Sequence, residues 1–427
     1  MSHRPHGSST SPVAVVLGGI ELVRPLALAG IRCEVVTKPK DAARFSRHAT
    51  TIFTWDWSEP VGHHDDELVA RLIRYAELQP EPPILFYQWD EPLLFLSRHR
   101  EELARAFRFV IADPFLVEAL VDKSLFGTLA QERSLPVPAT SILTPSSDAS
   151  ATDLSHLGFP LILKPFRRDR RWDVIEETHK MKAVRVDRLE ELQKIWPRLA
   201  AVAGSILAQR YVEGPESRVE SYHVYVDEHG KIAAEFTGRK VRTLPAQCGY
   251  STALTITDAP DVAEHGREFV RALDLKGVAK FDFKRGPDGE LYLLEVNPRF
   301  SLWHHPGARA GVNIPALVYS DLAGHPRPEV HARNGVRWCH PDDFWAAREA
   351  GVSPVRWARW ALASETKAIW SWDDPMPFLS TAARRVVSTA FAAGRGGPTE
   401  RHYGQGGESA SRSSAPAAGL RPVRRRR

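Results

Sequence analysis

The chain has few cysteines and lacks any long apolar run. Its 427 residues include only three cysteines, Cys33, Cys248 and Cys339, far apart from one another. Isolated cysteines argue against a disulfide framework and a thiolate metal site, and they fit a reducing cytoplasm. No apolar stretch approaches the roughly 20 residues of a membrane span. The polar residues 1–12 lack the apolar core of a signal peptide, so we expect a cytoplasmic protein with a flexible N-terminus.

A basic domain is also missing, although the formal net charge is +5. Residues 394–427 contain eight arginines and two glutamates, so this segment alone accounts for the positive charge. The remainder is close to neutral, which gives no support to nucleic-acid binding. Because the segment is rich in glycine, serine, alanine and arginine, we expect it to be a disordered tail.

The length exceeds that of one compact core, so two or three domains are expected. A buried-type strand at 13–19, a helical pattern and a second strand predict a β-α-β unit. Its glycines do not form the dinucleotide-binding fingerprint, which argues against an NAD enzyme. A further strand at 84–87 ends next to Gln88, Asp90 and Glu91. These residues either bind a ligand at the strand end or begin a helix.

Residues 280–300, KFDFKRGPDGELYLLEVNPRF, predict a β-hairpin, because two β-rich runs flank a Pro-Asp-Gly turn. Asp282 lies in the first strand and Glu295 near the end of the second, with Asn297 and Arg299 just beyond. Since side chains alternate along a strand, Glu295, Asn297 and Arg299 can point the same way. Such a polar set suits a hard cation held against phosphate better than it suits a core.

The order of these pieces resembles the ATP-grasp superfamily of carboxylate–amine and carboxylate–thiol ligases. The matching pieces are a helix with Asp122-Lys123, a strand that ends in Lys164, the segment QRYVEG, and the hairpin that ends in EVNPR. The Trp-rich C-terminal segment looks like that of the predicted ATP-dependent carboligases, which include D-aspartate ligase-like proteins. The superfamily likeness covers about residues 13–325.

The resemblance implies an α/β (α+β) architecture, an ATP-grasp fold with ATP between two of its three α/β pieces. The implied organisation is a flexible N-terminus (1–12), a Rossmann-like pre-ATP-grasp α/β domain (13–115), an ATP-grasp domain of two α+β subdomains (116–325), a helical Trp-rich extension (326–393) and the disordered Arg-rich tail (394–427).

Residue by residue, the resemblance implies that Asp282, Glu295 and Asn297 are ligands of Mg²⁺, for which Mn²⁺ is a possible substitute. Arg299 matches an arginine that contacts the acyl-phosphate or the transferring phosphoryl group. Its fork of donors would stabilise developing charge. Lys280 faces the same side of its strand as Asp282, and we expect it to hold the oxyanion of the tetrahedral intermediate.

The implied nucleotide-binding residues come from earlier segments. Lys123 matches a nucleotide-contacting lysine, for which the alternative is a surface lysine at a helix start. Lys164 matches the strand-end lysine that reaches the ATP phosphates. Glu216 matches a glutamate that binds ribose, and Glu213 is the competing candidate. The backbone of the hinge, which consists of Gln209, Arg210, Tyr211 and Val212, would hold adenine.

Two basic segments leave alternatives open. The segment after Lys164 has no glycine to cradle phosphate, so its arginines either replace that cradle or form a solvated lid surface. These arginines are Arg167, Arg168, Arg170 and Arg171. In the second segment, Arg239, Lys240 and Arg242 suit a carboxylate substrate beside the ATP site, or else protect an exposed strand edge by charge.

We therefore predict an ATP-dependent ligase that activates a small-molecule carboxylate as an acyl-phosphate for attack by an amine. The substrates are expected to be amino-acid or peptide-like. The alternative is a non-catalytic ATP-binding or regulatory module. The adjacent His304 and His305 follow the hairpin, but adjacent histidines on a helix diverge, so a zinc site is not expected there.

Overall fold

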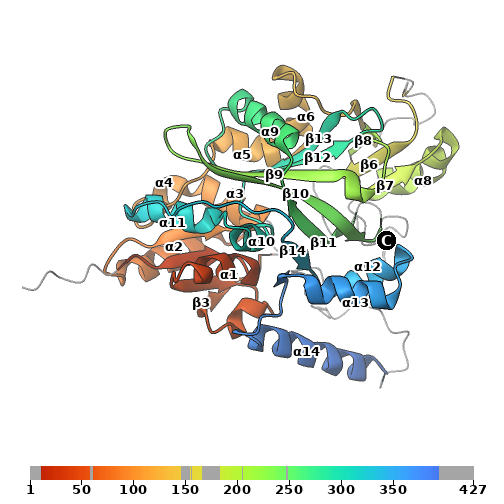
Figure 1. Cartoon of the computed structure of the whole chain (residues 1–427). Helices are drawn as coiled ribbons and strands as arrows, with labels where there is room; N and C mark the ends of the chain where they lie inside the picture. Colours follow the sequence, from red (N-terminus) through yellow and green to blue (C-terminus); the bar gives the residue numbers. More distant parts are fainter. Residues whose placement is uncertain are drawn as a thin grey trace, which may run out of the picture.

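The computed structural model describes residues 11–57, 61–145, 154, 156–165, 183–203, 205–246 and 249–393. The expected tail at 394–427, the four arginines after Lys164 and Cys248 lie outside the described residues. Three sheets form the frame of the described chain: a four-stranded parallel sheet, a second four-stranded sheet and a seven-stranded sheet (Figure 1).

The N-terminal domain is built on the parallel sheet, with strand order β3-β2-β1-β4. Strand β1 is buried along its whole length, as expected for a parallel strand covered on both faces. The predicted β-α-β opening is therefore confirmed. The elements are β1 (Ala14–Leu17), α1 (Ile20–Leu28), β2 (Cys33–Thr37), η1 (Ala42–Phe45), β3 (Ala49–Thr54), α2 (Asp65–Glu77), β4 (Ile84–Tyr87), α3 (Asp90–Arg98) and α4 (Arg100–Leu103).

A helical pair leads into the small sheet. After Asp113 the chain forms two helices in succession, because Asp122 caps the second one by accepting from the Ser124 backbone N–H at 2.9 Å. The small sheet has the order β5-β8-β6-β7 and its own apolar core around Leu161 and Trp196. The elements are α5 (Pro114–Val121), α6 (Lys123–Glu132), β5 (Thr140–Leu143), β6 (Leu161–Pro165), β7 (Val184–Val186), α8 (Leu189–Ala203) and β8 (Ile206–Arg210).

The seven-stranded sheet has the order β13-β12-β9-β10-β11-β14-β15 and contains the predicted hairpin of residues 280–300. β12 pairs antiparallel with β13, as the Pro-Asp-Gly turn predicted, and β9 forms a second antiparallel pair with β10. Its apolar core is continuous with that of the N-terminal domain. The elements are η3 (Glu216–Arg218), β9 (Val219–Val226), β10 (Ile232–Leu244), β11 (Tyr250–Thr257), α9 (Pro260–Ala272), β12 (Gly277–Arg285), β13 (Leu291–Asn297), α10 (His304–Arg309) and α11 (Ile314–Ala323).

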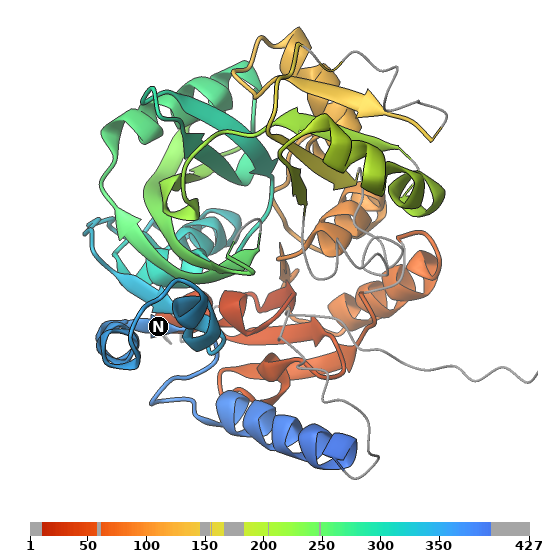
Figure 2. The ribbon, with the colours of Figure 1, turned by 90° about the vertical axis from the view of Figure 1, so that its right-hand side faces the viewer.

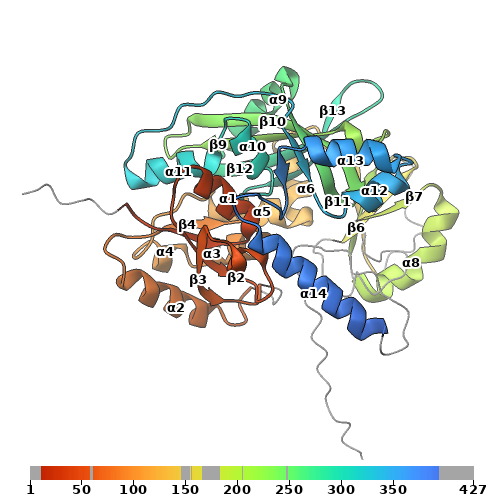
Figure 3. The same cartoon turned by 60° about the horizontal axis from the view of Figure 1, so that its bottom comes forward.

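The C-terminal extension is mostly helical, but it also adds two short strands to the large sheet. β14 pairs with β11 and β15 pairs with β14. The chain then crosses to the N-terminal domain, where α14 lies against η1 (Figures 2 and 3). None of the described helices has both the length and the apolar character needed to cross a membrane. The elements are β14 (Arg337–Cys339), α12 (Asp343–Glu349), α13 (Pro354–Ala363), β15 (Thr366–Lys367) and α14 (Met376–Ala393).

Candidate active site

The β12–β13 hairpin brings polar side chains to one face of the large sheet. Its register places Asp282 opposite Glu295, and Lys280 opposite Asn297. Residues that are directly opposite in an antiparallel pair have neighbouring side chains on the same face. The register shifts just beyond Asp282, where β13 has one extra residue, and such bulges re-aim side chains locally.

Asp282 is 1% exposed, and its carboxylate is surrounded by donors. Ser221 of β9 donates its hydroxyl to Oδ1, and Lys280 Nζ donates to Oδ2 at 2.6 Å. Lys240 Nζ of β10 lies 3.5 Å from the same Oδ2. Three strands of the large sheet therefore converge on one carboxylate.

Charge decides the protonation state of this buried group. Burial by itself would raise the pKa of Asp282, but the neighbouring ammonium groups of Lys240 and Lys280 outweigh it and hold that pKa well below its usual range. Burial would lower the pKa of Lys240, yet Asp282, Glu295 and Glu216 raise it. The charges of both predicted carboxylates therefore act on one lysine, and Asp282 and Lys240 are both charged near neutral pH.

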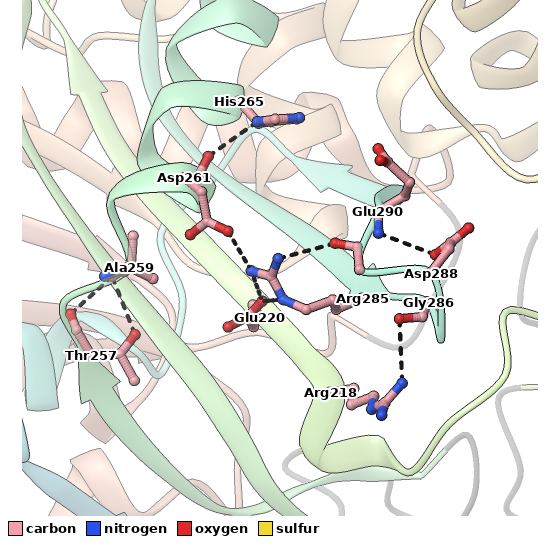
Figure 4. Close-up of polar contacts among 12 residues, drawn as sticks. Arg218, Glu220, Thr257, Ala259, Asp261, His265, Arg285, Gly286, Asp288 and Glu290 are labelled. Carbon is pink, nitrogen blue, oxygen red and sulfur yellow. Dashed lines mark hydrogen bonds and ion pairs between the residues drawn. The ribbon is translucent and has the colours of Figure 1, made fainter.

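The hairpin is fixed from outside this cluster as well. Arg285, at the end of β12, donates to Glu220 Oε2 at 2.6 and 2.9 Å and lies 2.8 Å from Asp261 Oδ2 (Figure 4). It also donates to the Gly289 carbonyl at 3.2 Å, and Arg218 donates to the Gly286 carbonyl at 3.3 Å. These contacts tie the turn to β9 and α9 and hold the polar face of the hairpin in place.

Arg299 connects the hairpin to the N-terminal domain. Its guanidinium donates to Asp90 Oδ1 at 2.5 Å, to the Gln88 carbonyl at 3.1 Å and to Asn297 Oδ1 at 3.2 Å. Asp90 begins α3, so the residues after β4 both start a helix and bind the predicted catalytic arginine. The buried side chain of Gln88 accepts from the Gly19 N–H and donates to Glu21, so only its backbone carbonyl contacts Arg299.

The two lysines predicted to contact the nucleotide meet at the end of β6. Lys123 Nζ donates to the Pro165 carbonyl at 3.2 Å, although Lys123 is the first residue of α6. Lys164 Nζ donates to Gln209 Oε1 at 2.9 Å. The structure therefore brings Lys123, Lys164 and the start of the predicted hinge together.

The rest of the hinge faces the hairpin strand. Lys284 Nζ lies 4.4 Å from the centre of the Tyr211 ring and 3.8 Å from Glu216 Oε1. Val212 is buried, whereas the competing Glu213 is exposed. The side chain of Arg210 turns away and donates to the carbonyl of Leu157 at 2.7 Å. The Arg210 side chain therefore points away from the predicted hinge, and only the backbone of Arg210 is placed to contact adenine.

Two members of this arrangement were missed by the sequence reasoning, Ser221 and Lys284. Lys284 follows Asp282 by two positions, so the alternation that pointed to Lys280 also places Lys284 on that face. Nothing in the sequence singles out Ser221, since only the pairing of β9 with β12 sets it opposite Asp282.

The basic segment of β10 is divided among three environments. Arg239 is exposed, Lys240 joins the Asp282 cluster, and Arg242 forms a two-pronged ion pair with the buried Asp343 of α12. β10 is paired on both sides, with β9 and β11, so protection of an exposed strand edge does not apply. The ion pair with Asp343 instead anchors the C-terminal extension to the large sheet.

His304 and His305 are both buried. His304 Nδ1 lies 3.0 Å from the Ser301 carbonyl, and burial lowers the pKa of His304 to about 4. Within the described part of the chain, no group of three or more histidine, cysteine, aspartate or glutamate side chains is arranged to hold a metal. The predicted Mg²⁺ set contains only two such residues, Asp282 and Glu295, together with the amide of Asn297.

Comparison of the sequence with known proteins finds ATP-grasp proteins and amino-acid ligases. A family described as "ATP-grasp in the biosynthetic pathway with Ter operon" matches residues 204–341. The chain is 28% identical over 283 residues to a D-aspartate ligase of Enterococcus faecium, covering 64% of this chain and 65% of the relative. It is 25% identical over 232 residues to a D-alanine–D-alanine ligase of Ectopseudomonas mendocina, covering 50% and 67%. The chain thus spans slightly less than two thirds of the length of the D-aspartate ligase.

Solved structures agree on the fold. An L-amino acid ligase from Bacillus licheniformis superposes with a TM-score of 0.56 at 14% identity, over 77% of this chain and 78% of that one. A biotin carboxylase from Campylobacter jejuni, in a βγ-ATP complex, gives a TM-score of 0.57 at 14% identity, over 77% and 74%. The chain therefore resembles ATP-grasp proteins in sequence over residues 204–341 and has their fold. The predicted ATP-grasp fold with an N-terminal parallel-sheet domain is confirmed.

The three sheets correspond to the three α/β pieces that the resemblance implied. The predicted site residues all lie on two of these sheets and the segments next to them. The hairpin carries the predicted metal-binding and catalytic residues, whereas the small sheet carries Lys164 and the start of the predicted hinge. The exact domain limits and the ligand assignments of individual residues stay predictions.

Proposed function

We propose that this ATP-grasp protein is an ATP-dependent ligase that joins a carboxylate to an amine and releases ADP and phosphate. The observation that carries the proposal is the shared hairpin face, on which Asp282 lies opposite Glu295 and Lys280 opposite Asn297. The two curated relatives are named as ligases, which supports the reaction class. Their names also motivate amino-acid-like substrates.

The donor set fits Mg²⁺, with Mn²⁺ as a possible substitute. Mg²⁺ prefers oxygen ligands and usually binds one or two carboxylates together with substrate phosphates. Asp282, Glu295 and Asn297 would supply the protein oxygens, and the low pKa of Asp282 keeps its carboxylate ionised as a ligand must be. When bound, the ion would neutralise charge on the transferring phosphoryl group.

Nucleotide binding is assigned to the small sheet and its hinge. The backbone of Gln209 to Val212 would hold adenine, and Glu216 would bind the ribose. Lys164 would reach the phosphates and Lys123 would contact the nucleotide, each exchanging its present contact with Gln209 or the Pro165 carbonyl for the nucleotide. Such positioning, with charge neutralisation, is most of what phosphoryl transfer requires of a protein.

In the first step, an oxygen of the substrate carboxylate attacks the γ-phosphorus of ATP. The bond to the bridging oxygen breaks, ADP leaves, and an acyl-phosphate remains. Arg299 is assigned to the transferring phosphoryl group, because its guanidinium is fixed by Asp90 and Asn297. A fixed fork of donors stabilises developing negative charge without reorganisation.

In the second step, the neutral amine attacks the carbonyl carbon of the acyl-phosphate. Lys280 is assigned to the oxyanion of the tetrahedral intermediate. The ammonium groups of Lys280 and Lys240 both contact Asp282 Oδ2. The C–O bond to phosphate then breaks, phosphate leaves, and the nitrogen loses its proton to give the amide. The buried free thiols of Cys33 and Cys339 support a reducing, cytoplasmic setting for this chemistry.

The test is ADP formation by the full chain in the presence of Mg²⁺, with amino acids and short peptides screened as acid and amine. A ligase forms ADP only when a matched acid and amine are both present. A non-catalytic module binds ATP but forms no ADP with any pair. ATP binding without ADP formation across the whole panel would therefore overturn the proposal.

A further inference from the structure

Lys284 is a buried cation of the large sheet for which no role was predicted. It lies on β12, two positions beyond Asp282, and it is 3% exposed. A lysine is almost never fully buried unless its ammonium group is paired, because removing an unpaired charge from water costs too much free energy. The contacts of this ammonium group therefore indicate what Lys284 does.

The ammonium group of Lys284 reaches the predicted hinge. Tyr211 directly follows β8 of the small sheet, whereas Lys284 belongs to the large sheet, so their contact joins the two sheets (Figure 1). Lys284 Nζ donates to the Tyr211 hydroxyl at 3.3 Å and lies 4.4 Å from the centre of the ring. The guanidinium of Arg185, on β7, lies 4.5 Å from the centre of the same ring. One cation from each sheet thus contacts the hinge tyrosine.

The same ammonium group forms an ion pair with Glu216, the predicted ribose-binding residue. Lys284 Nζ and Glu216 Oε1 are 3.8 Å apart, and the two side chains are only 4% and 17% exposed, so water screens their attraction little. Among the residues that the structure describes, none forms a hydrogen bond with the Glu216 carboxylate. The charge of Lys284 therefore orients this carboxylate, while its oxygens can still accept from a hydroxyl group.

We propose that Lys284 is a positioning residue that makes the nucleotide site selective for ribose over 2′-deoxyribose, by holding the Glu216 carboxylate toward the 2′-hydroxyl. The inference rests on the nucleotide-binding part of the proposed function. Lys284 acts through Glu216 and does not itself contact the sugar. The Tyr211 ring and hydroxyl hold the ammonium group in place, since a cation is attracted to the face of an aromatic ring.

The test compares ATP with 2′-deoxy-ATP, which differ by one hydroxyl group. Their dissociation constants are measured by titration calorimetry with the full chain and Mg²⁺, without an acid or an amine. The wild type should bind ATP at least about tenfold more tightly, the scale of one hydrogen bond to a charged group. Glu216→Ala should abolish this preference.

Lys284→Met removes the charge and keeps an unbranched side chain. It should reduce the preference for ATP to about threefold or less, because an unrestrained carboxylate loses most of its hydrogen bond to the 2′-hydroxyl. The affinity for 2′-deoxy-ATP should change little. In Glu216→Ala, the addition of Lys284→Met should alter the preference no further, since the lysine acts through the glutamate.

Two further variants serve as controls. Lys284→Arg keeps a cation that can stack on Tyr211 and pair with Glu216, so it should retain the preference for ATP. Lys276→Met, at the exposed position just before β12, is the matched control and should bind both nucleotides as the wild type does.

Thermal melting checks that Lys284→Met folds. Because the Glu216 side chain keeps 17% of its surface in water, the loss of its partner does not leave a fully buried charge. Lys284→Gln is a second variant without the charge, and it should lose most of the preference as well. An equal loss of affinity for both nucleotides in these variants would reveal a structural role alone and overturn the inference, and so would an unchanged preference.

The outcome is separable from that of the ligase proposal. A wild type that binds ATP and 2′-deoxy-ATP equally would overturn the inference and the assignment of Glu216 to ribose, while the ligase function would stand. The expected preference and its dependence on Lys284, without ADP formation for any acid and amine, would support the inference and overturn the ligase function.

Discussion

Arg299, just after β13, donates from Nε to Asp90 Oδ1 at 2.5 Å, across the boundary between the large sheet and the N-terminal domain. A second contact, to the Gln88 carbonyl at 3.1 Å, comes from the same segment. The two anchors restrict the guanidinium to one orientation. The N-terminal domain therefore positions a group of the candidate active site, in addition to any substrate it binds.

Asp90→Asn should lower ADP formation by about tenfold to a hundredfold, because a misplaced guanidinium no longer meets the transferring phosphoryl group. The dissociation constant for ATP should change little, since the hinge at Gln209 to Val212 is separate. Turnover and ATP binding are measured side by side. Glu118→Gln, which breaks the exposed pair with Arg98, serves as the control. Undiminished turnover in Asp90→Asn would show that the contact with Asp90 is not needed to position Arg299.

Glu295→Gln should bind ATP but lose substrate-dependent ADP formation by about a hundredfold or more, the scale of removing one electrostatic stabiliser. The exchange is nearly isosteric, so folding should be preserved. Glu290→Gln, in the exposed turn of the same hairpin, is the matched control. If both variants turn over like the wild type, the hairpin is not the catalytic metal site.

Asp41→Asn should change the pH dependence of stability. Burial, with help from Glu21, raises the pKa of Asp41 to about 7, above its value in the unfolded chain. A raised carboxyl pKa means that the folded chain binds more protons, so stability falls as pH rises from about 4 to 7. Asparagine cannot ionise, and its amide oxygen can still accept from the Ala43 N–H, which Asp41 binds at 2.7 Å.

The stability advantage of the variant over the wild type should therefore be about 2–3 kcal/mol larger at pH 8 than at pH 5, as a free energy of unfolding. Urea unfolding at the two pH values measures this difference. A difference between the two proteins that is independent of pH would refute the raised pKa of Asp41.

Arg24→Met should destabilise the chain by about 2–4 kcal/mol. Arg24 is 5% exposed, and its guanidinium donates to four successive backbone carbonyls, those of residues 367–370. Methionine would leave these carbonyls without their donor and release the crossing from β15 to α14. Urea unfolding measures the loss, and limited proteolysis should show new cleavage after residue 366. Arg32→Met, at an exposed position, should do neither.

Much of the candidate site could be predicted because strand geometry is local. The alternation of side chains correctly placed Glu295 and Asn297 together, and the Pro-Asp-Gly turn predicted which strands would pair. The same logic would have found Lys284, had it been applied along the whole of β12. It could not find Ser221, which depends on the register of β9 against β12.

The basic residues of β10 illustrate the limit of such reasoning. Arg239, Lys240 and Arg242 look alike in sequence, yet one is exposed, one binds Asp282 and one binds Asp343. Their partners are about 40 and 100 residues away in the chain. Only the pairing of β10 with β9 and β11 in the sheet decides which charged side chain lies next to each of these residues.

The sequence by itself determined the elements of the fold and the polar set of the hairpin, because turn residues, apolar runs and alternation act within a few residues. The tertiary structure decided which charges meet: Arg299 with Asp90, Lys240 with Asp282, and Arg24 with the C-terminal carbonyls. Such pairs depend on strand order and on how the domains pack. A buried charge must find its partner across the fold, since leaving it unpaired costs too much free energy.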